Sequence, residues 1–263
     1  MYLPKNYQQM RTWITTDLGR YVLQEETKVM CSILNNNFLK NILIIGEPEF
    51  ALSDDSLLID RNKSIYQFVV HPALSAANQL LDRNPKSLML IARQDKLPVD
   101  TNSIDIVILP HSLEMVVNPH EVLRESHRVL QPEGKIIITG FHCLSIWGIW
   151  KSIAKIFIKS PWRNNFFRVS KLFDWLALLG FDEVDVNYYC HNLPINNQKI
   201  LKKFGCLERI GDFMPFPLGN IYTVHACKRV IPLRPVFLSK WENVPLDDDE
   251  LAKHTLKHQL GIK

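Results

Sequence analysis

The segment from Ile104 to Phe141 constrains the fold more than any other part of this chain. Ile104–Leu109 is an apolar, β-branched run that ends before Pro110 and is too short for a helix. Lys135–Thr139 is a second β-branched run of the same kind. A helical pattern lies between them. Strand, helix and strand within about thirty residues predict a parallel crossover unit.

The helix of this unit has chemically marked ends. Asn118 is placed to cap its start, Pro119 to occupy its first turn, and Glu121 to reach back as in a capping box. Pro132 and Gly134 are expected to end it. Five residues then share one helical face and predict its buried side: Val122, Leu123, Ser126, Val129 and Leu130.

Parallel units of this kind build doubly wound sheets, which bind ligands at the carboxyl ends of their strands. Leu109 to Glu114 lies at such an end. His111 is therefore a candidate general base with a near-neutral pKa, or equally a loop histidine that hydrogen-bonds to backbone. Glu114 faces the same crevice as a substrate-binding candidate, or is a solvated loop acid.

The rest of the chain supplies further strands and helices. We expect strands at Asn41–Gly46, Ser87–Ile91, Phe181–Val186 and Tyr222–Lys228, with the second strand at either Leu57–Ile59 or Phe68–Val70. We expect one or two helices in Trp13–Leu34, a weak one in Ala73–Leu81, and one in Val169–Leu179 that Gly180 ends. The prediction is an α/β fold: a seven-stranded, mostly parallel sheet with helices on both faces, in one domain over residues 1–229. Residues 230–263 are expected to form a tail or an appended helix.

Composition limits the partners and the compartment. A net charge of +4, without Lys/Arg clusters interleaved with aromatic residues, does not indicate nucleic acid. The five cysteines are widely spaced and contain no Cys-x-x-Cys pair, so neither a disulfide framework nor a metal site is indicated. Reduced cysteines and the absence of a secretory signal or a membrane-length apolar run predict a cytoplasmic protein.

An aromatic insertion occupies residues 141–173. Lys151, Lys155 and Lys159 are four residues apart and give a basic stripe beside the aromatic one. The favoured interpretation is a lid that packs over the pocket, with Trp147 of this insertion as a substrate contact. The alternative is a helix that contacts a membrane surface.

The loop DKLPVDTNSIDIVIL (Asp95–Leu109), the helix NPHEVLRESHRVLQPEGK (Asn118–Lys135) and the strand KIIITGF carry a resemblance. Together they resemble the class I S-adenosylmethionine-dependent methyltransferases, in particular the methyltransferase type 11 group and, within it, a proteobacterial subfamily without a known substrate. The resemblance covers about Trp13 to Arg229. It implies a Rossmann-like fold and S-adenosylmethionine as the cofactor.

The resemblance also implies where the cofactor lies. Its site would be formed by Gly46, Glu47, Asp60, Asp95, Leu97, Leu109 and Pro110. The match is incomplete, because Ile44, Pro48 and Phe50 replace the acid and two glycines of the group's first-strand motif. Arg93 stands where the group has the acid that faces the adenine amine, two places before Asp95.

Two other acid and histidine positions remain open. Asp105 matches the group's fourth-strand acid and either shapes the cofactor loop or is a structural carboxylate at the start of a strand. His142 follows the fifth strand and either contacts a substrate or is structural.

Two functions are compatible with this pattern. The first is methyl transfer from S-adenosylmethionine to a small or lipophilic acceptor, driven mainly by proximity. The second is a methyltransferase-like binding or scaffold protein that has lost the reaction. The polar loops after the fourth and fifth strands favour the first. The sequence does not indicate the acceptor or an oligomeric state.

Overall fold

Seven strands form a single sheet in the order β3-β2-β1-β4-β5-β7-β6. The computed structural model describes residues 5–34, 41–47, 66–72, 87–154, 166–195 and 219–230. The strands are β1 (Asn41–Ile45), β2 (Tyr66–His71), β3 (Ser87–Ile91), β4 (Ile104–Pro110), β5 (Leu130–Phe141), β6 (Phe181–Tyr189) and β7 (Ile221–Lys228). β1 to β5 pair in parallel, and β7 runs antiparallel between β5 and β6. The predicted seven-stranded, mostly parallel sheet is confirmed.

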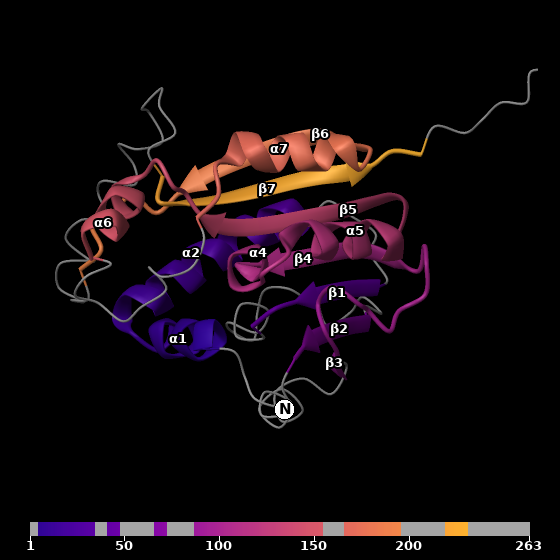
Figure 1. Cartoon of the computed structure of the whole chain (residues 1–263), viewed down its shortest axis with the longest axis horizontal. Coiled ribbons are helices and arrows are strands. Elements are labelled where there is room, and N and C mark those ends of the chain that lie inside the picture. Colours follow the sequence, from indigo (N-terminus) through magenta and orange to yellow (C-terminus); the bar gives the residue numbers. More distant parts are fainter. Residues whose placement is uncertain are drawn as a thin grey trace, which may run out of the picture. The chain divides into compact units, whose positions relative to one another are not determined.

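Helices cover both faces of this sheet (Figure 1). On one face, α5 (Pro119–Val129) and α7 (Val169–Leu178) pack against β1, β4, β5 and β7. On the other face, α2 (Asp17–Leu34) packs Met30 and Leu34 on isoleucines of β1, β4 and β5. The apolar β-branched residues of these strands are buried on both sides, which is why their sequences read as continuous apolar runs.

A third cluster lies at the carboxyl edge of the sheet. There α1 (Lys5–Ile14) and α6 (Ile146–Ala154) lie beside the strand ends (Figure 1). Trp13 of α1 makes edge-to-face contacts with Phe141 of β5 and Trp147 of α6. These contacts fix the first helix over the edge where a doubly wound sheet binds its ligand.

The boundaries of the crossover unit differ from those expected. The side chain of Asn118 makes no capping hydrogen bond, and Glu121 pairs instead with Arg124 at 2.8 Å. The predicted capping box is therefore wrong. β5 begins at Leu130, directly after the helix, because Leu130 pairs with Ile104. Pro132 and Gly134 therefore lie within β5, in the irregularity that precedes the pairing of Ile106 with Lys135.

Other elements follow the expectations. The N-terminal segment forms two helices, and the second strand contains Phe68–Val70. Gly180, at φ +81°, follows the end of α7 as a left-handed residue that glycine favours. Leu57–Ile59, Ala73–Leu81 and the expected tail beyond its first residue, 231–263, lie outside the described residues.

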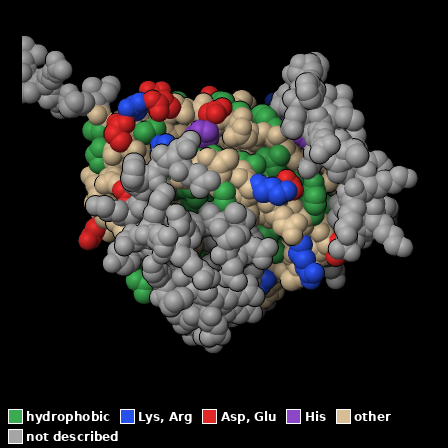
Figure 2. Space-filling view, turned by 180° about the vertical axis from the view of Figure 1, so that it is seen from behind, with side chains coloured by type: hydrophobic (Ala, Val, Ile, Leu, Met, Phe, Trp, Pro, Cys, Tyr) green, Lys and Arg blue, Asp and Glu red, His purple; other side chains and the backbone are tan. Residues whose placement is uncertain are grey.

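The surface mixes charge types. On the side seen in Figure 2, acidic and basic side chains are interspersed with apolar ones. Within the described part of the chain, no helix is long and apolar enough to cross a membrane.

Candidate functional site

Four parallel strands bring polar residues to the same edge of the sheet. Glu47 follows β1, His71 ends β2, Gln94 follows β3, and His111 follows β4. All four side chains are buried. Because the carboxyl ends of parallel strands form the ligand-binding edge, this buried polar group is the candidate site.

Gly46 makes the tight turn out of β1. Its φ is +139°, and a Cβ there would overlap Ser112 Oγ and lie 3.1 Å from the carbonyl oxygen of Pro110. Ser112 Oγ in turn donates a hydrogen bond to the carbonyl oxygen of Ile45. The one glycine that remains of the first-strand motif is thus required by the close approach of the loop after β4.

A buried polar cluster lies under α1. His71 Nε2 is 3.5 Å from Glu47 Oε1, and the Tyr7 ring meets the His71 ring edge-on at 5.5 Å. Burial, followed by the charge of Glu47, raises the pKa of Tyr7, so Tyr7 remains a neutral hydroxyl.

Gln94 completes this cluster and is 4% exposed. Its amide interacts with Tyr7, but neither its oxygen nor its nitrogen makes a hydrogen bond of good geometry to any residue that the structure describes. A buried amide left in this state costs about 1–3 kcal/mol. It is therefore a candidate for a group that pairs with a ligand at the ends of β1, β2 and β3.

His111 forms a second buried cluster with two carboxylates. Its Nε2 lies 2.6 Å from Glu26 Oε1 of α2, and its Nδ1 lies 3.2 Å from Glu114 Oε2. The other Glu114 oxygen accepts the backbone N–H of Phe141 at 2.5 Å. Glu114 belongs to the short helix α4 (Ser112–Met115), which His111 precedes in the left-handed conformation at φ +50°. The cluster joins α2, the loop after β4 and the end of β5.

The electrostatics of this cluster follow from its composition. Burial alone lowers the pKa of His111, but the charges and hydrogen bonds of Glu26 and Glu114 outweigh it and raise the pKa to about 10. Burial raises the pKa of Glu114, and His111 opposes that shift. His111 is thus an imidazolium at neutral pH, with both ring nitrogens engaged. This geometry argues against the general-base role and favours a role in holding the loop.

The other predicted substrate residues also lie inside the protein. His142 is buried, its Nδ1 lies 3.3 Å from the carbonyl oxygen of Gly219, and burial lowers its pKa. Trp147 is fully buried and donates its indole N–H to the carbonyl oxygen of Asn192 at 2.7 Å. Both side chains support the segment around α6.

The predicted cofactor residues are brought together only in part. Gly46, Glu47 and Pro110 lie at the carboxyl edge, whereas Leu97 and Leu109 belong to the apolar core. Asp95 pairs with the exposed Arg93, so the buried side chain of this loop is the intervening Gln94. Asp60 lies outside the described residues.

Two acidic residues of the motif have structural roles. Asp105 stands near the start of β4 and accepts the backbone N–H of Asn41 at 2.7 Å, which places it at the amino end of the sheet, away from the candidate site. Glu125 accepts the Leu97 N–H at 3.1 Å and pairs with Arg128. Arg128 also donates to the carbonyl oxygens of Leu97 and Val99. This pair within α5 therefore also fastens the loop before β4.

Sequence reasoning missed Tyr7, Glu26, His71 and Gln94. His71 had a usable signal, because it ends the second candidate strand. Tyr7 and Glu26 had none, since they come from N-terminal helices far from the strand ends in sequence.

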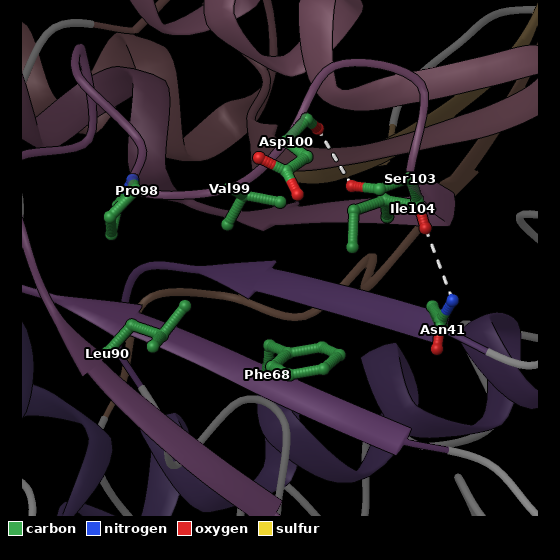
Figure 3. Close-up of a pocket in the computed structure, with 8 residues that line it drawn as sticks. All are labelled: Asn41, Phe68, Leu90, Pro98, Val99, Asp100, Ser103 and Ile104. Atoms are coloured by element: carbon green, nitrogen blue, oxygen red, sulfur yellow. Dashed lines mark hydrogen bonds between the residues drawn. The ribbon is translucent and has the colours of Figure 1, made fainter.

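A separate cavity of about 310 Å³ lies on one face of the sheet (Figure 3). Phe68 and Leu90 form its floor, and the loop at Pro98–Asp100 faces them. Asn41 and Ile104, which begin β1 and β4, also line it. The cavity lies over the strands near the starts of β1 and β4 rather than at the edge that holds Glu47 and His71.

Comparison with known proteins agrees with the fold. Residues 57–138 match the family model of a methyltransferase domain, Methyltransf_11. The uncharacterized protein YafS of Escherichia coli strain K12 is 33% identical over 149 residues, which are 57% of this chain and 58% of that protein. The match thus spans less than two thirds of the relative's length.

Solved methyltransferase structures have the same fold. One from Thermotoga maritima, described as a possible histamine N-methyltransferase, has a TM-score of 0.64 at 18% identity and covers 84% of this chain and 96% of its own. One from Archaeoglobus fulgidus has a TM-score of 0.53 at 15% identity, with coverages of 79% and 99%. The resemblance to class I S-adenosylmethionine-dependent methyltransferases and the fold that it implies are confirmed.

Proposed function

We propose, from the premise that this chain has the class I methyltransferase fold, that it transfers a methyl group from S-adenosylmethionine to a small or lipophilic acceptor. The observation that carries the proposal is the buried polar cluster of Glu47, His71 and Gln94 at the ends of β1, β2 and β3. A fold alone does not imply an activity, but buried polar groups at the ligand-binding edge are expected of a working site.

The residues present fit the cofactor, although they differ from the usual set. The Gln94 amide offers one donor group and one acceptor and suits the edge of an adenine ring. The Glu47 carboxylate suits ribose hydroxyls, and His71 fixes its position. The backbone at Gly46 and Pro110 would border the rest of the cofactor. When bound, the cofactor supplies a methyl group that its sulfonium already activates.

The protein's own contribution to transfer is mainly orientation. The pairing of His111 with Glu26 and Glu114 holds the loop after β4, and Glu114 ties this loop to Phe141 at the end of β5. A fixed loop keeps an acceptor aligned without a proton-accepting side chain. We assign His111 a positioning role on this ground.

The acceptor is proposed from the surroundings of the site. The segment that follows β5 is rich in aromatic residues, and the ring of Phe141 stacks on that of Phe166 with centroids 5.1 Å apart. Apolar surroundings of this kind favour a lipophilic acceptor. The alternative of an inactive binding or scaffold protein is not favoured, because the chain keeps buried polar groups at the ligand-binding edge of a methyltransferase fold.

Calorimetric titration with S-adenosylmethionine and S-adenosylhomocysteine tests the proposal. We expect both to bind, and Gln94→Ala to weaken binding about tenfold, as for the loss of one or two hydrogen bonds. Asp95→Ala is the matched control from the same loop and should leave affinity unchanged. Absence of binding up to millimolar ligand, by protein that circular dichroism shows to be folded, would overturn the proposal.

A further inference from the structure

Helix α6 presents apolar side chains to solvent. Ile149 is 63% exposed, Ile146 43% and Trp150 41%, and Leu144 just before the helix is 62% exposed. Ile146, Ile149 and Trp150 are three and four residues apart, so they share one side of the helix. We call these four residues the outer face of α6.

The inner side of the same helix is firmly anchored. The backbone N–H of Trp147 donates to Asn220 Oδ1 at 3.1 Å, and its indole N–H donates to the carbonyl oxygen of Asn192. A Cβ at Gly148 would overlap the backbone of Cys143, so the helix start is packed tightly. The exposure of the outer face is therefore built into the fold, and not the result of a loosely packed helix.

The segment that contains this face is strongly basic. Residues 141–173 hold six Lys or Arg and no Asp or Glu, so this segment alone carries more positive charge than the +4 of the whole chain. Lys151 lies at the end of the outer face, with its ammonium 3.8 Å from the centre of the Phe166 ring. Arg168 is exposed a short distance along the chain.

We propose that the outer face of α6 docks on the surface of an anionic lipid bilayer. An apolar helix face that carries a Trp, within a segment of uniformly positive charge, supplies the two signals that interfacial binding needs: burial among acyl chains and attraction to anionic headgroups. Tryptophan is favoured at that depth because its ring is amphipathic. We commit to a bilayer as the occupant because the segment around this face carries six Lys or Arg and no Asp or Glu, which is complementary to a surface of anionic headgroups.

Docking in this orientation connects to the candidate site. Helix α6 follows β5, whose last residue, Phe141, is bonded through its N–H to Glu114. Against the effect of burial, the positive charge of Lys151 on α6 also lowers the pKa of Glu114 slightly, so the helix and the candidate site are electrostatically coupled. The carboxyl edge of the sheet would then lie close to the bilayer, from which a lipophilic acceptor can enter. The docking itself does not depend on methyl transfer.

Vesicle flotation of the full chain tests the proposal. We expect the protein to float with vesicles of phosphatidylcholine and phosphatidylglycerol in a 7:3 ratio, to bind pure phosphatidylcholine at least about tenfold more weakly, and to be released by high salt. Ile149→Glu with Trp150→Glu should lower the partition coefficient at least about tenfold. Lys155→Glu with Lys159→Glu should abolish the preference for the anionic lipid.

Leu178→Glu is the matched control, because Leu178 is an 84% exposed apolar residue on α7. It should float like the wild type. Brominated phosphatidylcholine in the anionic vesicles should quench tryptophan fluorescence, and Trp150→Phe should remove most of that quenching. A wild type that does not float, an outer-face variant that floats unchanged, or equal loss of binding in Leu178→Glu would each overturn the proposal. The proposal would also be overturned if the wild type self-associates but does not bind vesicles, and the outer-face variant no longer self-associates.

Discussion

The Nε2 atom of His111 lies 2.6 Å from the Oε1 atom of Glu26, so the loop after β4 is bound to an N-terminal helix. Both side chains are almost completely buried, and Glu114 holds the other nitrogen of the ring. A buried imidazolium between two carboxylates is stable only while all three partners are in place. The N-terminal helices are therefore part of the site and not an appendage to it.

The raised pKa of His111 predicts how stability depends on pH. Its folded pKa of about 10 is above the ordinary 6.5, so the stabilisation is complete below pH 6.5 and is lost as the pH rises towards 10. Between pH 7.5 and 9.5 the free energy of unfolding should fall by up to about 1.4 kcal/mol per pH unit more in the wild type than in His111→Gln. Urea denaturation across this range measures the difference.

The partly exposed His225 provides the control for that comparison, and His225→Gln should keep the wild-type slope. A direct measurement does not require the variant to fold. The imidazole ¹⁵N shifts of His111 at pH 8 should be those of a doubly protonated ring. A neutral ring at that pH would contradict the assignment.

Arg128 should stabilise the loop before β4 through its several acceptors. Its guanidinium donates to the carbonyl oxygens of Leu97 and Val99 and pairs with Glu125. Arg128→Ala should lower the free energy of unfolding by about 1–3 kcal/mol, and Arg128→Lys should restore little of it, because an ammonium cannot span these acceptors. Arg124→Ala breaks an exposed pair on the same helix and should cost less than about 0.5 kcal/mol.

The part of the fold that the sequence predicts is the part with local signals. Pro119 starts α5, Gly180 follows the end of α7, and the β-branched runs form the central strands. The end of α5 was misplaced because it depends on a long-range pairing of Leu130 with Ile104. No local pattern at Pro132 or Gly134 reports that pairing.

The candidate site was predictable in position but not in composition. The strand ends indicated the edge and the loop that carries His111. They did not indicate Glu26, which is 85 residues away in sequence. The resemblance puts Arg93 at the place of the acid that faces the adenine amine and offers Asp95, two places on, as the cofactor residue. In the structure these two side chains pair with each other at the surface, and the neutral Gln94 between them is buried. The inward-facing Gln94 interacts with Tyr7, whose place over the strand ends no local pattern around residues 93–95 indicates.

Gly46 should be intolerant of any side chain. Gly46→Ala should destabilise the protein by well over 1 kcal/mol, because the added methyl overlaps Ser112 Oγ and the φ of +139° is strained for alanine. Gly180→Ala separates the steric overlap from the backbone strain, because Gly180 also has a positive φ but has no atom within 4 Å of an added Cβ. This variant should lose only about 1 kcal/mol of stability. Thermal unfolding of both variants measures the difference. If Gly46→Ala is no worse than Gly180→Ala, the close approach of Ser112 is not what selects glycine.

Asn220 should hold α6 in place from the start of β7. Its Oδ1 accepts the backbone N–H of Trp147 at 3.1 Å, and its Nδ2 donates to the carbonyl oxygens of Cys190 and Asn192 at 2.5 and 2.8 Å. Asn220→Ala leaves the buried Trp147 N–H without its acceptor and removes one of the two hydrogen bonds that each of the Cys190 and Asn192 carbonyl oxygens accepts. It should lower the free energy of unfolding by about 1–3 kcal/mol.

Asn220→Asp provides a sharper test, because it keeps the acceptor for Trp147 but removes both donors and buries a charge. It should be at least as destabilising as Asn220→Ala, whereas Asn187→Ala, at an exposed position of β6, should be neutral. Chemical denaturation gives the three free energies, and hydrogen exchange at the Trp147 amide shows whether α6 has detached. A stable Asn220→Ala protein with a protected Trp147 amide would mean that the packing of the Trp147 ring against Trp13 and Phe141 is sufficient to fix the helix.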